Sequence, residues 1–107
     1  MSVPQISIDD LESLLASGAR LFDVRELHEY VAGHVAGAIH IALGEVPAHV
    51  ERFAGDGPAH IICQAGGRSQ RAAEFLVEHG VEAINVAGGT GAWAASGRPL
   101  VVGDLPS

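Results

Sequence analysis

The chain has 107 residues, of which 48% are hydrophobic, and this is typical of one globular domain and not of a disordered chain. It contains no lysine and a single cysteine, Cys63, which excludes a phosphate-binding lysine, a lysine Schiff base, an internal disulfide and a zinc site with several cysteines. The net charge of −7 argues against nucleic acid as a partner, because proteins that bind it usually carry a basic excess.

The first half of the chain alternates short apolar runs with helical patterns. A weak strand signal at residues 4–7 leads into a helix that Ser7 caps and Gly18 ends. The next expected elements are a strand over residues 21–24, a short helix over 26–32 with Leu27, Tyr30 and Val31 on one face, and a strand over 38–43.

The second half continues this alternation. Helical spacing of Val46, Val50 and Phe53 predicts a helix with Pro47 near its start, and a loop follows at residues 55–58. The remaining expected elements are a buried strand over 59–63, a helix over 68–79 with Ala72, Phe75, Leu76 and His79 facing inward, a strand over 83–87, and a short helix around Trp93. We expect residues 98–107 to be a loosely held tail.

This order of elements predicts an α/β fold. One domain over residues 1–107 would hold a mainly parallel sheet, covered by helices on both faces. In an open parallel sheet, ligands bind beyond the carboxyl ends of the strands, so the residues that follow each strand are the candidates for a site.

Cys63 stands at such a strand end and is followed by a glycine-containing loop. Gly66 and Gly67 allow backbone N–H groups to turn inward, and the next helix directs its positive dipole end at the same point. Between residues 57 and 73 the only charged side chains are Arg68 and Arg71. A free cysteine is often simply a buried structural residue. The glycines, the arginines and the helix start favour instead a thiolate with a lowered pKa in an anion-binding loop.

Three segments of the sequence resemble single-domain rhodaneses. The first is the loop Cys63-Gln64-Ala65-Gly66-Gly67-Arg68-Ser69, which is similar to the active-site form C-x-x-G-x-R-S. The upstream segment starts at Asp23-Val24-Arg25 and continues through Glu29-Tyr30, Gly33-His34-Val35 and Gly37-Ala38-Ile39-His40-Ile41. The downstream segment is Gly88-Gly89-Thr90-Gly91-Ala92-Trp93, with Gly97 and Pro99. They follow one another in the family's order and cover nearly the whole chain.

The resemblance implies a five-stranded parallel sheet and transfer of sulfane sulfur through a cysteine persulfide. Cys63 would be the catalytic nucleophile, and the donor-binding residues would be Gln64, Ala65, Gly66, Gly67, Arg68, Ser69 and Arg71. The partners would be a small anionic donor such as thiosulfate and a thiol or protein acceptor. No metal or organic cofactor is needed, because cysteine itself carries the group. With no apolar run near the roughly 18 residues of a membrane span and no visible signal peptide, we expect a cytoplasmic protein without a membrane partner.

Other functions remain as alternatives. A sulfur carrier that binds a partner protein would show little activity on free thiosulfate. A cysteine phosphatase is disfavoured because four residues separate Cys63 from Arg68, where phosphatases place five. An arsenate reductase that resolves its intermediate with a second internal thiol is disfavoured because the chain has one cysteine.

The remaining polar motifs have structural interpretations. We expect Asp23 and Arg25 to fix the turn after their strand, with Arg25 paired to Glu29 four residues on, and not to act as a catalytic acid and a substrate clamp. Arg71 has a similar alternative, an ion pair with Glu74. The spacing of the histidines does not predict a metal site: His28, His34 and His40 are expected to be structural, and His49, His60 and His79 to lie at surface or partly buried positions.

Overall fold

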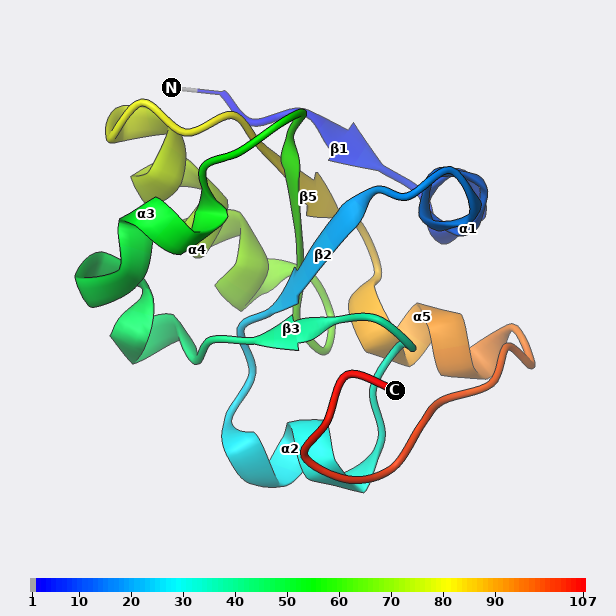
Figure 1. Cartoon of the computed structure of the whole chain (residues 1–107). Helices are drawn as coiled ribbons and strands as arrows, with labels where there is room; N and C mark the ends of the chain where they lie inside the picture. Colours follow the sequence, from blue (N-terminus) through cyan, green and yellow to red (C-terminus); the bar gives the residue numbers. More distant parts are fainter. Residues whose placement is uncertain (1) are drawn as a thin grey trace.

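The computed structural model describes residues 2–107 and contains one five-stranded parallel sheet (Figure 1). The strand order across the sheet is β1-β5-β4-β2-β3, with every neighbouring pair parallel. The strands are β1 (Gln5–Ile6), β2 (Arg20–Asp23), β3 (Ile39–His40), β4 (Ala59–Ile62) and β5 (Ala83–Val86). The helices are α1 (Ile8–Ala16), α2 (Leu27–Ala32), the 3-10 helix η1 (Leu43–His49), α3 (Val50–Phe53), α4 (Gly67–Glu78) and α5 (Gly89–Ala95). The α/β architecture and the parallel sheet expected from the sequence are confirmed.

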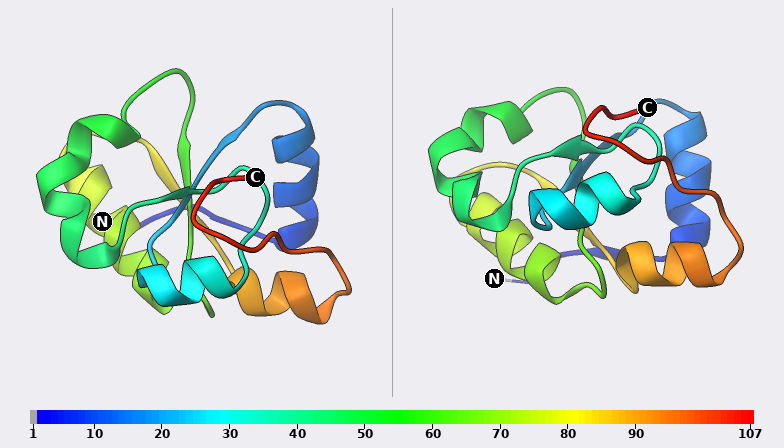
Figure 2. Two further views of the ribbon diagram at one scale, coloured as in Figure 1. Left: turned by 60° about the horizontal axis from the view of Figure 1, so that its bottom comes forward. Right: turned by 90° about the horizontal axis from the view of Figure 1, so that it is seen from below.

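Helices cover both faces of the sheet, and each face has its own hydrophobic core (Figure 2). Alternate residues of a strand point to opposite faces, so Ile61 of β4 packs against η1, α3 and α4, whereas Ile62 packs against α1, α2 and α5. All four residues of β4 are buried, as expected for the central strand of such a sheet. The carboxyl end of β4 therefore lies in the middle of the row of strand ends, between the ends of β2 and β5.

The segment after β3 differs from the expectation. The strand expected over residues 38–43 is limited to Ile39–His40, and the helix expected around Val46 is divided into η1 and α3. Pro47 has no N–H to donate to the Leu43 carbonyl, so an α-helix through this segment would lack one of its hydrogen bonds. The segment begins instead with a 3-10 contact, in which the Glu45 N–H donates to the Ala42 carbonyl at 2.8 Å.

Residues 98–107 are not a loosely held tail, and the expectation is corrected here. Val101 forms a two-way backbone bridge with His34, at N···O distances of 2.9 and 2.8 Å. The backbone N–H of Gly37 donates to the carbonyl of Pro106 at 2.9 Å, and that of Gly103 donates to Val31. The segment is held because the loop after α2 leaves backbone donors that only this segment satisfies.

Two side chains lie elsewhere than expected, and for His79 the expected surface position is confirmed whereas the inward-facing one is wrong. Leu27 is 55% exposed and is not on the buried face of α2. His79 is exposed at the end of α4, where its ring stacks on Phe75 and its Nδ1 contacts the Phe75 carbonyl at 2.8 Å, because the helix there extends past the core. His60 is fully buried in the central strand, where Nδ1 lies 3.1 Å from the carbonyl of Arg20.

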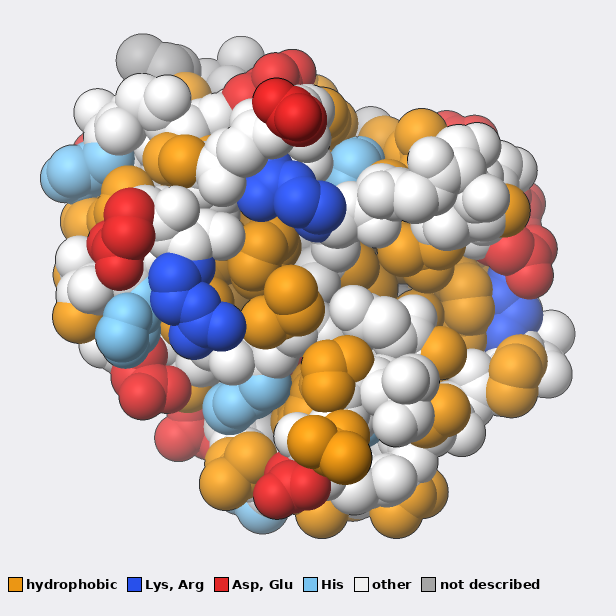
Figure 3. Space-filling view, in the orientation of Figure 1, with side chains coloured by type: hydrophobic (Ala, Val, Ile, Leu, Met, Phe, Trp, Pro, Cys, Tyr) orange, Lys and Arg blue, Asp and Glu red, His pale blue; other side chains and the backbone are white. Residues whose placement is uncertain are grey.

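Within residues 2–107, no helix has the length and apolar character that crossing a bilayer requires. On the face drawn in Figure 3, basic side chains lie singly among acidic and neutral ones and do not form a stripe. Acidic side chains are likewise scattered over that face.

Candidate active site

Cys63 lies directly after β4 and is 1% exposed. The chain turns from there into α4, and Gly66 occupies the N-cap position of that helix with φ +109°. Residues other than glycine rarely adopt this left-handed backbone conformation, so Gly66 allows the loop to close around the cysteine. The two-glycine loop predicted from the sequence therefore has the tight form that we expected.

The sulfur of Cys63 accepts hydrogen bonds from the loop that follows it. The backbone N–H of Gly66 donates to Sγ at 3.1 Å, and the hydroxyl of Ser69 donates at 3.3 Å. Burial acts to raise the pKa of the Cys63 thiol, but hydrogen bonds from the Ser69 hydroxyl and from the backbone of Ser69, Gly66 and Ala65 outweigh it, so that the pKa is lowered. The site thus favours a thiolate without direct contact from a basic side chain.

Neighbouring backbone segments fix the position of the loop. Thr90 donates its N–H to the carbonyl of Cys63 at 2.8 Å, and Gly91 donates to the carbonyl of Gln64 at 2.9 Å. A Cβ atom on Gly89 would clash with the Cys63 carbonyl and lie 2.7 Å from that of Gln64. The turn before α5 is therefore glycine-rich because it packs directly on the loop that follows Cys63. Asn85, which the sequence analysis did not single out, donates to the Gly66 carbonyl at 3.2 Å.

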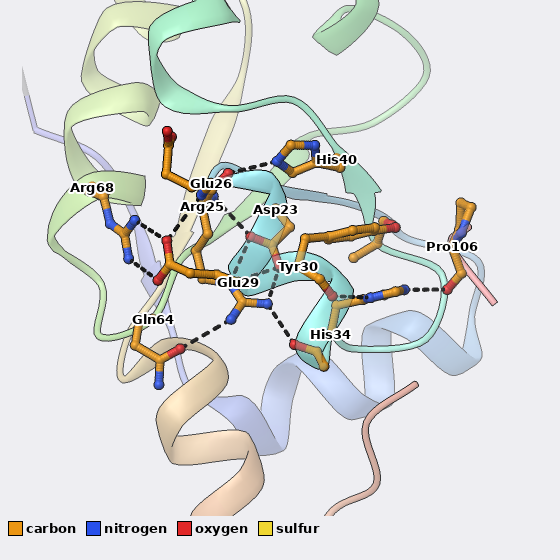
Figure 4. Close-up of polar contacts among 12 residues, drawn as sticks. Asp23, Arg25, Glu26, Glu29, Tyr30, His34, His40, Gln64, Arg68 and Pro106 are labelled. Carbon is orange, nitrogen blue, oxygen red and sulfur yellow. Dashed lines mark hydrogen bonds and ion pairs between the residues drawn. The ribbon is translucent and has the colours of Figure 1, made fainter. Parts of the chain in front are cut away.

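Asp23 and Arg25 form a buried ion pair at the carboxyl end of β2 (Figure 4). Arg25 Nη2 lies 2.9 Å from Asp23 Oδ2, and Asp23 Oδ1 accepts the Arg25 backbone N–H at 3.0 Å. Arg25 also donates to the Gly33 carbonyl at 2.8 Å and to Gln64 Oε1 at 3.2 Å. The pair thus fixes the turn after β2, as expected. Arg25 also holds the side chain of Gln64, the residue that follows Cys63.

The expected ion pair between Arg25 and Glu29 is wrong. Glu29 pairs instead with Arg68, at 2.6 Å from Nη1 to Oε1 and 2.9 Å from Nη2 to Oε2, and the two side chains face each other in Figure 4. Arg25 turns towards Asp23 because that carboxylate lies in the buried turn, whereas Glu29 faces α4. Arg68 lowers the pKa of Glu29 from 4.5 to about 2, chiefly through this hydrogen bond.

Arg71 is exposed and does not pair with Glu74. Glu74 instead accepts a hydrogen bond from Gln70 Nε2 at 3.1 Å. Among the ion pairs of residues 2–107, none includes Arg71. Of the two arginines predicted to bind the donor, Arg71 has an uncompensated charge and Arg68 does not.

Of the three histidines expected to be structural, His34 and His40 have buried or partly buried contacts, whereas His28 is exposed. His34 is buried, with Nδ1 at 2.8 Å from the Tyr30 carbonyl and Nε2 at 2.9 Å from that of Leu105. His40 Nε2 lies 2.7 Å from the carbonyl of Arg25. In the described part of the chain, no three His, Cys, Asp or Glu side chains gather in the way that a metal site needs.

Comparisons with known proteins agree with this geometry. The family of Rhodanese-like domains matches residues 7–96. YtwF of Bacillus subtilis, a candidate sulfurtransferase, is 33% identical over 101 residues, which cover 92% of this chain and 98% of YtwF. YrkF of the same organism, a candidate sulfur carrier protein, is 36% identical over 95 residues, and the match spans 86% of this chain and 51% of YrkF.

A solved structure gives the same result. The crystal structure of a rhodanese-related protein from Thermoplasma volcanium has a TM-score of 0.86 and 31% identity, and it covers 92% of this chain and 98% of that one. This structure shares the fold of the chain along nearly its whole length. The chain therefore belongs to the Rhodanese-like domain family and is of the sulfurtransferase type.

Proposed function

We propose that Cys63 takes a sulfane sulfur from thiosulfate or a persulfide donor and passes it to a thiophilic acceptor. With thiosulfate, the Cys63 thiolate attacks the outer sulfur, a sulfur–sulfur bond forms to Cys63, and the bond to the sulfonate sulfur breaks with its electron pair leaving as sulfite. The product is a Cys63 persulfide. A thiolate or cyanide then attacks its outer sulfur and releases the Cys63 thiolate.

The observation that carries this proposal is the pair of hydrogen bonds to Sγ from the Gly66 N–H and the Ser69 hydroxyl. They stabilise the anionic sulfur that must both attack the donor and leave the persulfide. Ser69, although fully buried, keeps a polar hydrogen aimed at the sulfur.

The donor would be bound by the loop residues Gln64, Ala65, Gly66, Gly67, Arg68 and Ser69, and by Arg71. The backbone N–H groups of the loop and the start of α4 supply positive potential. Arg71 adds a free charge that is one helical turn from Arg68. The protein would act in the cytoplasm on a small anionic donor and a thiol or protein acceptor, and the reaction requires no metal, organic cofactor, nucleic acid or membrane.

A second candidate is a sulfur carrier that receives sulfur from a protein persulfide and has little activity on free thiosulfate. The ion pair of Arg68 with Glu29 favours it, because the one cation within the loop is already neutralised. The similarity to YrkF, a candidate sulfur carrier, agrees with it.

The test is the intact mass of the protein after incubation with thiosulfate or with cysteine persulfide. We expect one added sulfur on the wild-type protein, loss of that sulfur on addition of cyanide, and no addition to Cys63→Ser. Added sulfur from both donors supports the enzyme, and added sulfur from cysteine persulfide alone supports the carrier. Equal sulfur addition to folded Cys63→Ser contradicts both.

A further inference from the structure

The Cys63 site combines a stabilised thiolate with a nearby cation whose charge is already balanced. Glu29 engages both terminal nitrogens of Arg68 with its two carboxylate oxygens, at 2.6 and 2.9 Å. This bidentate geometry is the strong form of an arginine–carboxylate contact. Glu29 also accepts the backbone N–H of Glu26 through Oε1 at 3.1 Å, so its carboxylate is anchored at the start of α2.

Arg68 lies in the first turn of α4, five positions after Cys63. The Cys63 charge is among the causes that raise the pKa of Arg68, after the Glu29 hydrogen bond. Glu29 remains ionised at neutral pH, since its pKa is about 2. The pair therefore presents no net charge to a donor that approaches Cys63 under physiological conditions.

The charged side chains beside the Arg68–Glu29 pair have partners of opposite charge as well. A hollow of about 300 Å³ lies beside it, between α2, Gln64 and α5, and its only charged lining residues are Arg25 and Glu29. Arg25 is paired with Asp23, and Glu29 with Arg68. The remaining lining is uncharged and includes Thr90, Ala94 and Leu100. A doubly charged donor meets no uncompensated cation in this hollow.

We propose that Glu29 is a specificity-determining residue. By neutralising Arg68, it makes the site favour sulfane-sulfur donors that carry at most one negative charge and disfavour the thiosulfate dianion. The inference rests on the proposed sulfur transfer by Cys63. The favoured class comprises organic persulfides and thiosulfonates. With a hydropersulfide, the Cys63 thiolate bonds to the terminal SH sulfur, and the donor's sulfur–sulfur bond breaks with its electron pair leaving on the organic thiolate.

A matched pair of donors isolates the effect of one charge. Thiosulfate and methanethiosulfonate both offer a terminal sulfur bonded to a sulfonyl sulfur, but a methyl group replaces one charged oxygen in the second. Attack on methanethiosulfonate gives the same Cys63 persulfide and releases methanesulfinate. The measurement is the ratio of kcat/KM for thiosulfate to kcat/KM for methanethiosulfonate.

Glu29→Gln keeps an oxygen for the Glu26 N–H but removes the charge opposite Arg68. The Coulomb energy scales with the donor's charge, so we expect kcat/KM to rise about tenfold for thiosulfate and about threefold for methanethiosulfonate. The donor ratio then rises about threefold, and the rise shrinks at high salt. A general disturbance of the site would lower both values together and leave the ratio unchanged.

Two further variants test the direction of the effect. Arg68→Gln leaves the charge of Glu29 uncompensated, so the donor ratio should fall about threefold. This variant still tests the proposal if Glu29→Gln does not fold. Glu26→Gln is the control: it removes an equal charge at the same helix start, where no ion pair with Arg68 exists, and should change the ratio less than twofold.

An unchanged ratio in both Glu29→Gln and Arg68→Gln, with persulfide still forming on Cys63 from both donors, overturns the role of Glu29 and leaves the proposed sulfur transfer standing. No added sulfur on wild-type Cys63 from either donor contradicts the proposed function, and this inference with it.

Discussion

Replacing Ser69 by alanine should raise the pKa of the Cys63 thiol and slow its reactions at neutral pH. The Ser69 hydroxyl donates to Sγ at 3.3 Å and is fully buried, so no water replaces it without rearrangement. It stabilises the thiolate much more than the thiol, because a charged acceptor makes the stronger hydrogen bond. The N–H of Gly66 remains in the variant, so we expect only part of the lowering to be lost.

The size of the effect follows from the strength of one such contact. A hydrogen bond to a charged group contributes about 1.5–3 kcal/mol, and the long distance to sulfur places this one at the lower end. Losing about 1.4 kcal/mol shifts the thiol–thiolate equilibrium about tenfold towards the thiol. Alkylation of Cys63 by iodoacetamide at pH 7 should therefore slow by up to about tenfold, and reach the wild-type rate at high pH.

The lowered pKa of Cys63 also makes the free energy of unfolding depend on pH. The folded-state pKa of Cys63 lies below that of an unfolded thiol, about 8.5, so the contacts to the thiolate stabilise the fold fully above that pH. This contribution is lost as the pH falls through the folded-state pKa. In Ser69→Ala the difference is smaller, and the free energy of unfolding should vary less over this range.

The assay is the pH profile of alkylation for the wild type, Ser69→Ala and Ser13→Ala. Ser13 is an exposed serine on α1 and serves as the control, with a wild-type profile expected. If folded Ser69→Ala alkylates with the wild-type profile, the hydroxyl does not stabilise the thiolate, and the backbone of the loop alone accounts for the lowered pKa.

Three other changes have defined outcomes. Arg71→Ala should raise KM for thiosulfate about fivefold or more, since Arg71 is exposed and uncompensated, and steady-state kinetics at low salt would show an unchanged KM if it plays no part. Gly89→Ala should destabilise the fold by at least about 2 kcal/mol and disturb the loop, because φ is +61° and the new Cβ meets the Cys63 carbonyl; urea unfolding measures this. Removing residues 104–107 should lower Tm by several degrees, because His34 then loses its Nε2 partner, and an unchanged Tm would mean that the segment adds no stability.

Much of the fold followed from local patterns in the sequence. The apolar run before Cys63, the glycines that end the helices and the cap at Ser7, whose side chain accepts the Asp10 N–H at 3.1 Å, are features of consecutive residues. Such features depend on backbone conformation and periodicity, so they are legible without the tertiary structure. The segment from Leu43 to Phe53 was less predictable, because it is divided between a 3-10 helix and an α-helix, which the spacing of its apolar residues does not distinguish.

The candidate site was predictable where it depends on consecutive residues and not where it depends on contacts between distant ones. The sequence placed Cys63 at a strand end and Gly66 and Ser69 in the loop after it, because all three lie within seven consecutive residues. It could not assign partners to the arginines. Charge and spacing allowed Arg25 with Glu29, but the folded chain pairs Arg25 with Asp23.

By itself, then, the sequence determined the parallel α/β fold, the position of Cys63 at a strand end and the loop that follows it, since periodicity, glycine positions and strand ends are local properties. Only the tertiary structure decided that Glu29 faces Arg68 across 39 positions of sequence, that Arg71 remains free, and that the last ten residues are held by His34 and its neighbours. Those contacts depend on how α2, α4 and the C-terminal segment pack around one sheet edge, and side-chain charge selects among partners only after packing has brought them within reach.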